Sequence, residues 1–146
     1  MRDILRQGEL AFFALNRVCF HERLPYTPVL AGEDQAKYCA AFIRSKTRPR
    51  ILLNVPFLRE KPLYHLVNTV FHEMIHAFCY LNSIDDVQDG QHTEQFKHCV
   101  ERFGGICEQT SAGWEKAYLP DGTGTMSIVI EYMEYIERME KQSKGE

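Results

Sequence analysis

The sequence predicts an α+β fold, in which helices and a small antiparallel sheet share one core. Apolar residues recur at helical spacing in four segments, two in the middle of the chain and one near each end. Two runs of β-forming residues flank a turn-forming stretch, which is typical of a hairpin. With 146 residues, 45% of them hydrophobic, the chain is long enough for one buried core. We therefore expect residues 1–146 to form a single domain.

The first half of the chain is expected to contain one helix and three strands. Residues 1–20 carry apolar side chains at near-helical spacing. "TPVLAG" (27–32) is a candidate short strand. The runs "KYCAAFIRS" (37–45) and "RILLNVPFL" (50–58), separated by "KTRP", predict a hairpin. Pro56 lies late in the second run, which is typical of an edge strand or of a strand end.

The second half is expected to be mostly helical. Pro62 suits the first turn of a helix that runs to about Asn82, and a polar loop follows it. Residues 92–103 predict a second helix, which two glycines end. Residues 106–126 contain several turn-forming residues and are expected to be irregular. Residues 127–142 predict an amphipathic final helix, with the serine at its start as the cap.

Composition favours an intracellular protein without a membrane partner. No apolar run approaches the roughly 20 residues that cross a bilayer, and the polar start of the chain does not resemble a signal peptide. The cysteines are odd in number and include no CxxC pair, which indicates reduced thiols rather than a disulfide framework. They are Cys19, Cys39, Cys79, Cys99 and Cys107.

The segment "LVNTVFHEMIHAFCYLNS" (66–83) places two histidines four residues apart with a glutamate between them. On a helix, with His72 at 0°, His76 lies at about 40° and Glu73 at about 100°. The apolar side chains of the segment occupy an arc from about 140° to about 300° on the other side. The two imidazoles therefore share one face, and the glutamate lies beside them.

This H-E-x-x-H pattern is typical of zinc metallopeptidases. Two imidazoles one turn apart can both bind a single Zn²⁺ through nitrogen. The zinc lowers the pKa of a bound water, and Glu73 is placed to accept a proton from it during attack on a peptide carbonyl. The alternative is that the histidines only pack in the core and bind no metal. The separation of polar from apolar residues around the helix argues against this alternative.

A catalytic zinc needs a third protein ligand and an open position. His92 lies where a returning chain could direct it at the first helix, and we choose it as the third ligand. Glu94 is the second candidate, as a carboxylate ligand. His98 lies about 240° around a helix from His92, so one metal cannot bind both from the same helix.

One dense basic cluster stands apart from an otherwise weakly acidic chain, whose net charge is −3. It is the stretch "RSKTRPR", with Arg44, Lys46, Arg48 and Arg50. These cations could bind nucleic-acid phosphates. A solvated hairpin tip explains them more simply, and the acidic C-terminal third does not suit a general nucleic-acid binder.

The zinc-helix segment, the stretch "DGQHTEQF", and the upstream "FFALNRVCFHERLP" and "RILLNVPFL" resemble the SprT-like metalloprotease family, which includes Spartan. The resemblance covers about residues 10–107. It implies one zinc per chain, held by His72, His76 and His92, with Glu73 as the general base. It also implies a zincin-like arrangement, in which a small antiparallel sheet lies beside the zinc helix and peptide substrates bind along an edge strand.

The resemblance also implies a role in cleaving proteins crosslinked to DNA. We expect an intracellular location, in the nucleus or the cytoplasm. Two departures bear on this. The usual Gly-His pair is here Gly90-Gln91-His92, and residues 108–146 lack the cysteine-ligated zinc subdomain of many family members. We therefore expect a zinc-dependent metalloendopeptidase that acts on protein or peptide substrates. The alternative is a non-catalytic interaction module that zinc braces, which chelation would unfold.

Overall fold

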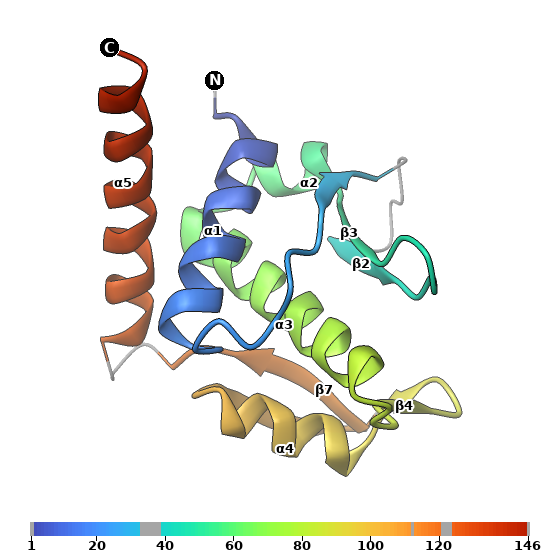
Figure 1. Ribbon diagram of the computed structural model, residues 1–146. Helices are drawn as coiled ribbons and strands as arrows, with labels where there is room; N and C mark the ends of the chain where they lie inside the picture. The colour runs from blue at the N-terminus through green and yellow to red at the C-terminus, as the bar shows by residue number, and fades with distance from the viewer. Residues whose placement is uncertain (1, 33–38, 112, 121–123, 146) are drawn as a thin grey trace.

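The computed structural model describes residues 2–32, 39–111, 113–120 and 124–145 and confirms the α+β class. Figure 1 shows helices on both sides of a long central helix, with a small sheet at one edge. The described helices are α1 (Ile4–Val18), α2 (Val55–Arg59), α3 (Leu63–Leu81), α4 (Glu94–Arg102) and α5 (Thr125–Ser143). The described strands are β1 (Val29–Ala31), β2 (Ala40–Ile43), β3 (Arg50–Leu53), β4 (Val87–Gln88), β5 (Gln91–His92), β6 (Ile106–Thr110) and β7 (Gly113–Tyr118).

The largest sheet has the order β1-β3-β2. The predicted hairpin is confirmed, because β2 and β3 pair antiparallel with Phe42 opposite Ile51. The sheet is mixed rather than purely antiparallel, since β1 pairs parallel with β3 on its other side. Of the two alternatives for Pro56, the edge strand is wrong, whereas the strand does end shortly before this residue. The central strand β3 ends at Leu53, and Asn54 caps α2, whose first turn tolerates a proline.

Helix α3 is the central element of the fold. It begins after Pro62, which is its cap, and ends before Asn82, so the predicted limits are confirmed. Its apolar side packs against α1, with Leu66, Val70 and Met74 fully buried. The polar side of a helix usually faces solvent, but the polar side of α3 is covered by β2, α4 and β7. The site residues of α3 are therefore held between elements from both halves of the chain.

Two other expectations are wrong. Residues 106–110 and 113–118 are not irregular but form the antiparallel strands β6 and β7, and residues 112 and 121–123 of that segment lie outside the described residues. Most side chains of these strands are exposed, so they lack the apolar alternation that identifies a half-buried strand. Ser127 does not cap the final helix. Helix α5 begins two residues earlier, after Gly124, whose φ of 79° belongs to the left-handed region.

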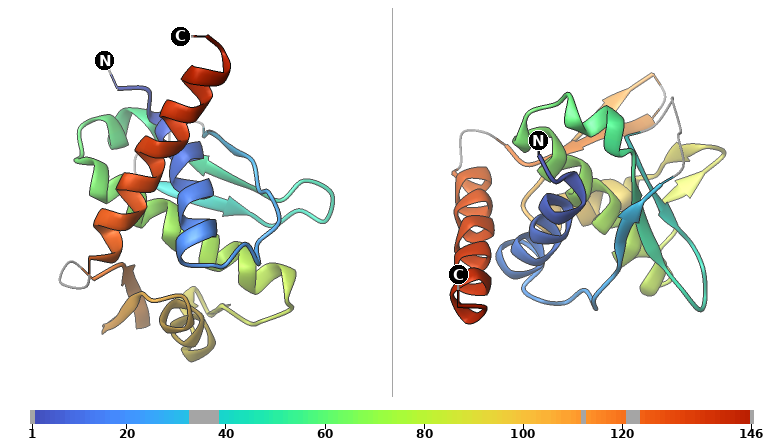
Figure 2. Two further views of the ribbon diagram at one scale, coloured as in Figure 1. Left: turned by 60° about the vertical axis from the view of Figure 1, so that its left-hand side comes forward. Right: turned by 90° about the horizontal axis from the view of Figure 1, so that it is seen from above.

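Helix α5 packs antiparallel against α1, on the side of α1 away from the three-stranded sheet (Figure 2). Arg6 of α1 and Glu140 of α5 form an ion pair between the two helices. No helix among the described residues combines the length and the apolar character that a membrane span requires.

Candidate metal centre

Three histidine side chains converge at the side of α3 that faces β5 and α4. The Nε2 atom of His76 lies 3.1 Å from Nε2 of His72 and 3.1 Å from Nε2 of His92. Two of these residues come from consecutive turns of α3, and the third comes from β5. Among the described residues, this trio is the group of histidine, cysteine and acidic side chains able to hold a metal ion.

A short hairpin brings His92 to the other two histidines. Strand β4 pairs antiparallel with β5, with Val87 opposite His92. The two turn residues, Asp89 and Gly90, have φ angles of 53° and 77°, as a type I′ turn requires. His92 therefore lies in a strand and not at the start of α4, which Thr93 caps through Phe96 N–H. The dipeptide Asp-Gly is a strong hairpin signature, so sequence reasoning could have found this turn.

The other ring nitrogens of two histidines are engaged by acceptors. Nδ1 of His76 donates to Oδ2 of Asp86 at 2.7 Å, and Nδ1 of His92 donates to the carbonyl of Trp114 at 2.8 Å. A ring that carries its proton on Nδ1 presents the Nε2 lone pair to a metal. These bonds therefore select the tautomer that leaves Nε2 available at the point where the rings meet.

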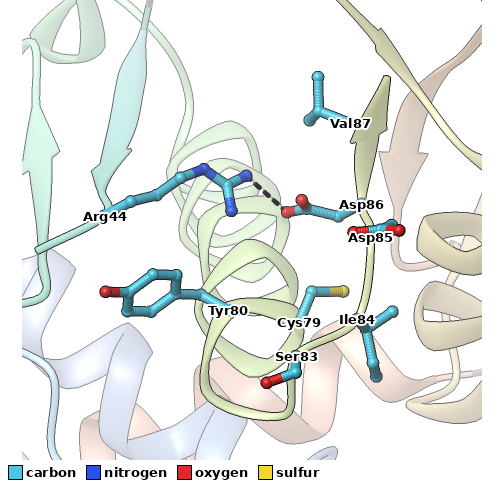
Figure 3. A pocket seen from close by; sticks show the side chains of 8 residues that line it. All are labelled: Arg44, Cys79, Tyr80, Ser83, Ile84, Asp85, Asp86 and Val87. Carbon is cyan, nitrogen blue, oxygen red and sulfur yellow. Dashed lines mark hydrogen bonds and ion pairs between the residues drawn. The ribbon is translucent and has the colours of Figure 1, made fainter. Parts of the chain in front are cut away.

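Asp86 also binds Arg44, as Figure 3 shows. The Nη2 atom of Arg44 lies 2.7 Å from Oδ2 of Asp86, the oxygen that accepts from His76. Burial alone would raise the pKa of Asp86, but hydrogen bonds from His76 and Arg44, together with their charges, lower it to about 2. The carboxylate thus stays ionised and orients His76. With Tyr80, the Arg44–Asp86 pair lines a pocket of about 420 Å³.

One aromatic ring contacts all three imidazoles. Phe96 of α4 is fully buried, and its ring stacks on His92 with 4.2 Å between centroids. The same ring lies 4.8 Å from the ring of His76 and 5.2 Å from that of His72. Because one apolar group contacts all three imidazoles, it restricts their rotation and keeps water from that side of the site.

Glu73 lies beside the histidines and is 9% exposed. Burial raises the pKa of its carboxyl group to about 7, against the opposing effects of His76, the backbone of Phe42 and Arg44. Burial also lowers the pKa of His72 and of His92, and neighbouring histidines lower both further, so both rings favour the neutral form. The site therefore combines two imidazoles that favour the neutral form, those of His72 and His92, with a carboxyl group that titrates near neutral pH.

A cleft of about 720 Å³ opens onto this group. Its floor is α3, with His65, Asn68 and Glu73, and its walls are β2 with Ala40 and β7 with Lys116. The histidines therefore lie in a cleft that a strand borders on each side.

Other predicted residues lie apart from this group. Glu94 and His98 are exposed on α4, outside the group of converging histidines. Lys46 and Arg48 are exposed in the β2–β3 loop, and Arg50, at the start of β3, donates to the Arg48 carbonyl. Their proposed role with nucleic acid stays a prediction. Arg44 differs, because Asp86 engages its guanidinium.

Three contributors were missed from sequence: Asp86, Phe96 and the Trp114 carbonyl. Asn68 and Thr69 also line the cleft, where Asn68 accepts from the backbone of Leu119 and Thr69 donates to a carbonyl of its own helix. Partners of this kind depend on how distant segments pack, and no local spacing reveals them.

The fold and the histidine trio define an α+β protein with a candidate metal centre on its central helix. The sequence model of the SprT-like family matches residues 9–115, which is most of the chain, so this chain belongs to the SprT-like family. That membership suggests a protease-type enzyme. No curated protein and no solved structure matches the chain.

Proposed function

We propose that this protein is a zinc-dependent metallopeptidase of zincin-like architecture. The observation that carries the proposal is the convergence of His72, His76 and His92 through their Nε2 atoms, with the buried Glu73 beside them. Membership of the SprT-like family points in the same direction.

The donor set suits one zinc ion. Zn–N bonds of about 2.1 Å at tetrahedral angles separate two ligand nitrogens by about 3.4 Å. The Nε2 separations of 3.1 Å need only a small outward movement of the rings to match this value. Three neutral imidazoles leave a fourth position for water or substrate, as catalytic zinc sites require. Zinc held by the three histidines would supply Lewis acidity, which polarises a peptide carbonyl and lowers the pKa of a bound water.

Glu73 would carry the proton transfers. As a carboxylate it would accept a proton from the attacking water, and as a carboxylic acid it would return that proton to the departing amine. In the metal-free protein burial raises the pKa of Glu73 to about 7, so both forms are accessible near neutral pH. The apolar ring of Phe96 on the other side of the imidazoles limits competing contacts with water.

An extended peptide is the substrate that suits the cleft. Strand β2 lies at one edge of its sheet and contributes Ala40 and Ala41 to the cleft wall. A peptide that added to this edge would bind through backbone hydrogen bonds, with little dependence on its sequence. We therefore propose endopeptidase activity on unstructured protein segments.

Glu73→Gln tests the proposal directly. The variant should bind zinc at the parent's stoichiometry of one per chain and remain folded, but lose hydrolysis of an unfolded protein such as casein by at least about 100-fold. His76→Ala should lose both zinc and activity. Glu94→Gln changes an exposed glutamate in the same way and should keep both. Equal rates for the parent and Glu73→Gln would reject Glu73 as the base.

We further propose that the peptidase binds DNA and cleaves proteins that are bound to it. With Arg44 engaged by Asp86, the exposed cations Lys46 and Arg48 and the neighbouring Arg50 would have to supply the phosphate contacts. DNA binding should weaken steeply with added salt and disappear when Arg48 and Arg50 are replaced by glutamine. Absent or salt-insensitive binding would remove DNA from the proposal and leave the peptidase intact.

A further inference from the structure

Helix α5 lies beyond the family match, which ends at residue 115, and it carries two apolar stripes. The first includes Met126, Val129 and Met133, all buried. This stripe packs toward α1 and accounts for the attachment of α5 to the rest of the molecule. The second stripe is mostly exposed and contributes one half-buried side chain to the core.

The second stripe consists of Ile128, Tyr132, Tyr135 and Met139. Ile128 is 53% exposed, Tyr135 45% and Met139 39%. Steps of four, three and four residues separate these side chains, so on a helix they lie within an arc of about 60°. The centre of this arc is about 120° from the centre of the buried stripe, and of its four side chains only Tyr132 packs against the core.

This spacing is that of a coiled-coil seam, in which apolar residues alternate at steps of four and three. In that register Glu131 and Arg138 occupy equivalent positions beside the seam, one heptad apart. Both side chains are exposed, and neither forms an ion pair among the residues that the structure describes. One acid and one base therefore flank the same side of an apolar seam whose side chains, apart from Tyr132, are exposed.

We propose that the second stripe of α5 pairs with the α5 helix of a second copy of this chain, in antiparallel orientation. A two-fold axis between Tyr132 and Tyr135 would place Ile128 opposite the partner's Met139. It would also place Glu131 opposite the partner's Arg138, and Arg138 opposite the partner's Glu131. The two symmetric ion pairs select this orientation.

Parallel pairing lacks the same complementarity. It would bring Glu131 next to the partner's Ile136, which offers no opposite charge. The seam spans three helical turns, shorter than the contacts that hold permanent dimers together. We therefore infer a reversible dimer in the micromolar range. Since none of these residues lines the cleft at α3, pairing leaves that cleft accessible.

Sedimentation velocity of the full chain over a range of concentrations tests this proposal. The parent should change from monomer to dimer as concentration rises, and Ile128→Glu should remain monomeric. Glu131→Arg and Arg138→Glu should each weaken the dimer about tenfold or more, because like charges then face each other across the axis. The double variant Glu131→Arg/Arg138→Glu exchanges the charges and should restore dimerisation.

Glu134→Arg is the matched control, since it makes the same charge change at an exposed position away from the seam. It should dimerise like the parent. Circular dichroism of every variant would verify that α5 and the fold are kept. The proposal is overturned if the parent is monomeric throughout, if Glu134→Arg weakens association as much as Glu131→Arg, or if the charge exchange fails to restore it. Neither zinc content nor peptidase activity enters this test, so its result is independent of the proposed function.

Discussion

The carboxylate of Asp86 lies between His76 and Arg44, with one oxygen 2.7 Å from Nδ1 of the histidine and 2.7 Å from Nη2 of the arginine. His76 is a proposed metal ligand, so Asp86 would orient it and increase its basicity. Arg44 in turn holds Asp86 in place.

Asp86→Asn should therefore lower zinc affinity by about 10- to 100-fold without removing a ligand. Arg44→Gln should have a smaller effect, because the aspartate would keep its contact with the ring. Competition with a chromophoric chelator measures both affinities. Unchanged affinity in Asp86→Asn would mean that the contact does not orient the ligand.

His92→Ala should abolish stoichiometric zinc binding, since two imidazoles on α3 cannot complete the site alone. His98→Ala is the matched control. It removes an exposed histidine of α4, six residues further along, and should retain one zinc per chain. Zinc content after dialysis distinguishes the two. Loss of zinc in His98→Ala would contradict the proposed ligand set.

Gly90→Ala should destabilise the fold by about 1 kcal/mol, because an L side chain at φ 77° is strained even in open space. Gly104, at φ 91° and also in open space, is the control, and Gly104→Ala should cost about as much. Only Gly90→Ala should also weaken zinc binding, since its turn positions His92. Urea unfolding and chelator competition measure the two effects. Equal loss of zinc affinity in both variants would contradict this role for the hairpin.

The contribution of Asp86 to stability should depend on pH. Its pKa of about 2 in the folded protein lies below the value of about 3.9 expected in the unfolded chain. The stabilisation is therefore present above pH ~4 and is lost as pH falls through about 2. Without metal, the free energy of unfolding of the parent should exceed that of Asp86→Asn by about 1 kcal/mol at pH 6, allowing for solvent screening. The difference should be smaller at pH 3. Urea titrations at both pH values check this, and a difference that grew with acid would contradict it.

Metal removal should leave the protein folded. The core contains fully buried side chains from separate elements, such as Leu15, Leu53 and Phe71, and none of them depends on the site. Excess EDTA should abolish proteolysis and lower the melting temperature only through the lost binding free energy. Circular dichroism checks the fold. Unfolding on chelation would support the braced, non-catalytic module instead.

The sequence predicts those features of the site that depend on residues close together in the chain. His72, Glu73 and His76 could be placed on one side of α3 because helical periodicity fixes angles within a few turns. His92 could be chosen because it follows the loop through which the chain returns to α3, although it lies in β5 rather than at the start of α4. Asp86 and Phe96 could not be found, because their contacts arise only when the 83–93 segment and α4 fold back onto α3.

Strand prediction failed where burial was slight. The β2–β3 hairpin was recognisable because β3 alternates buried and half-buried side chains, whereas β6 exposes four of its five residues. The basic stretch shows a different limit. Arg44 and Lys46 look equivalent in sequence, but only the arginine meets a buried carboxylate contributed by a segment about 40 residues away.

Arg44 follows directly after β2, where the chain leaves the sheet for its exposed turn. A molecule that displaced this turn would pull on Asp86, and the imidazole that shares that carboxylate would lose part of its support. Surface events at the tip of the sheet would thus be transmitted to the candidate metal centre through the side chains of Arg44 and Asp86.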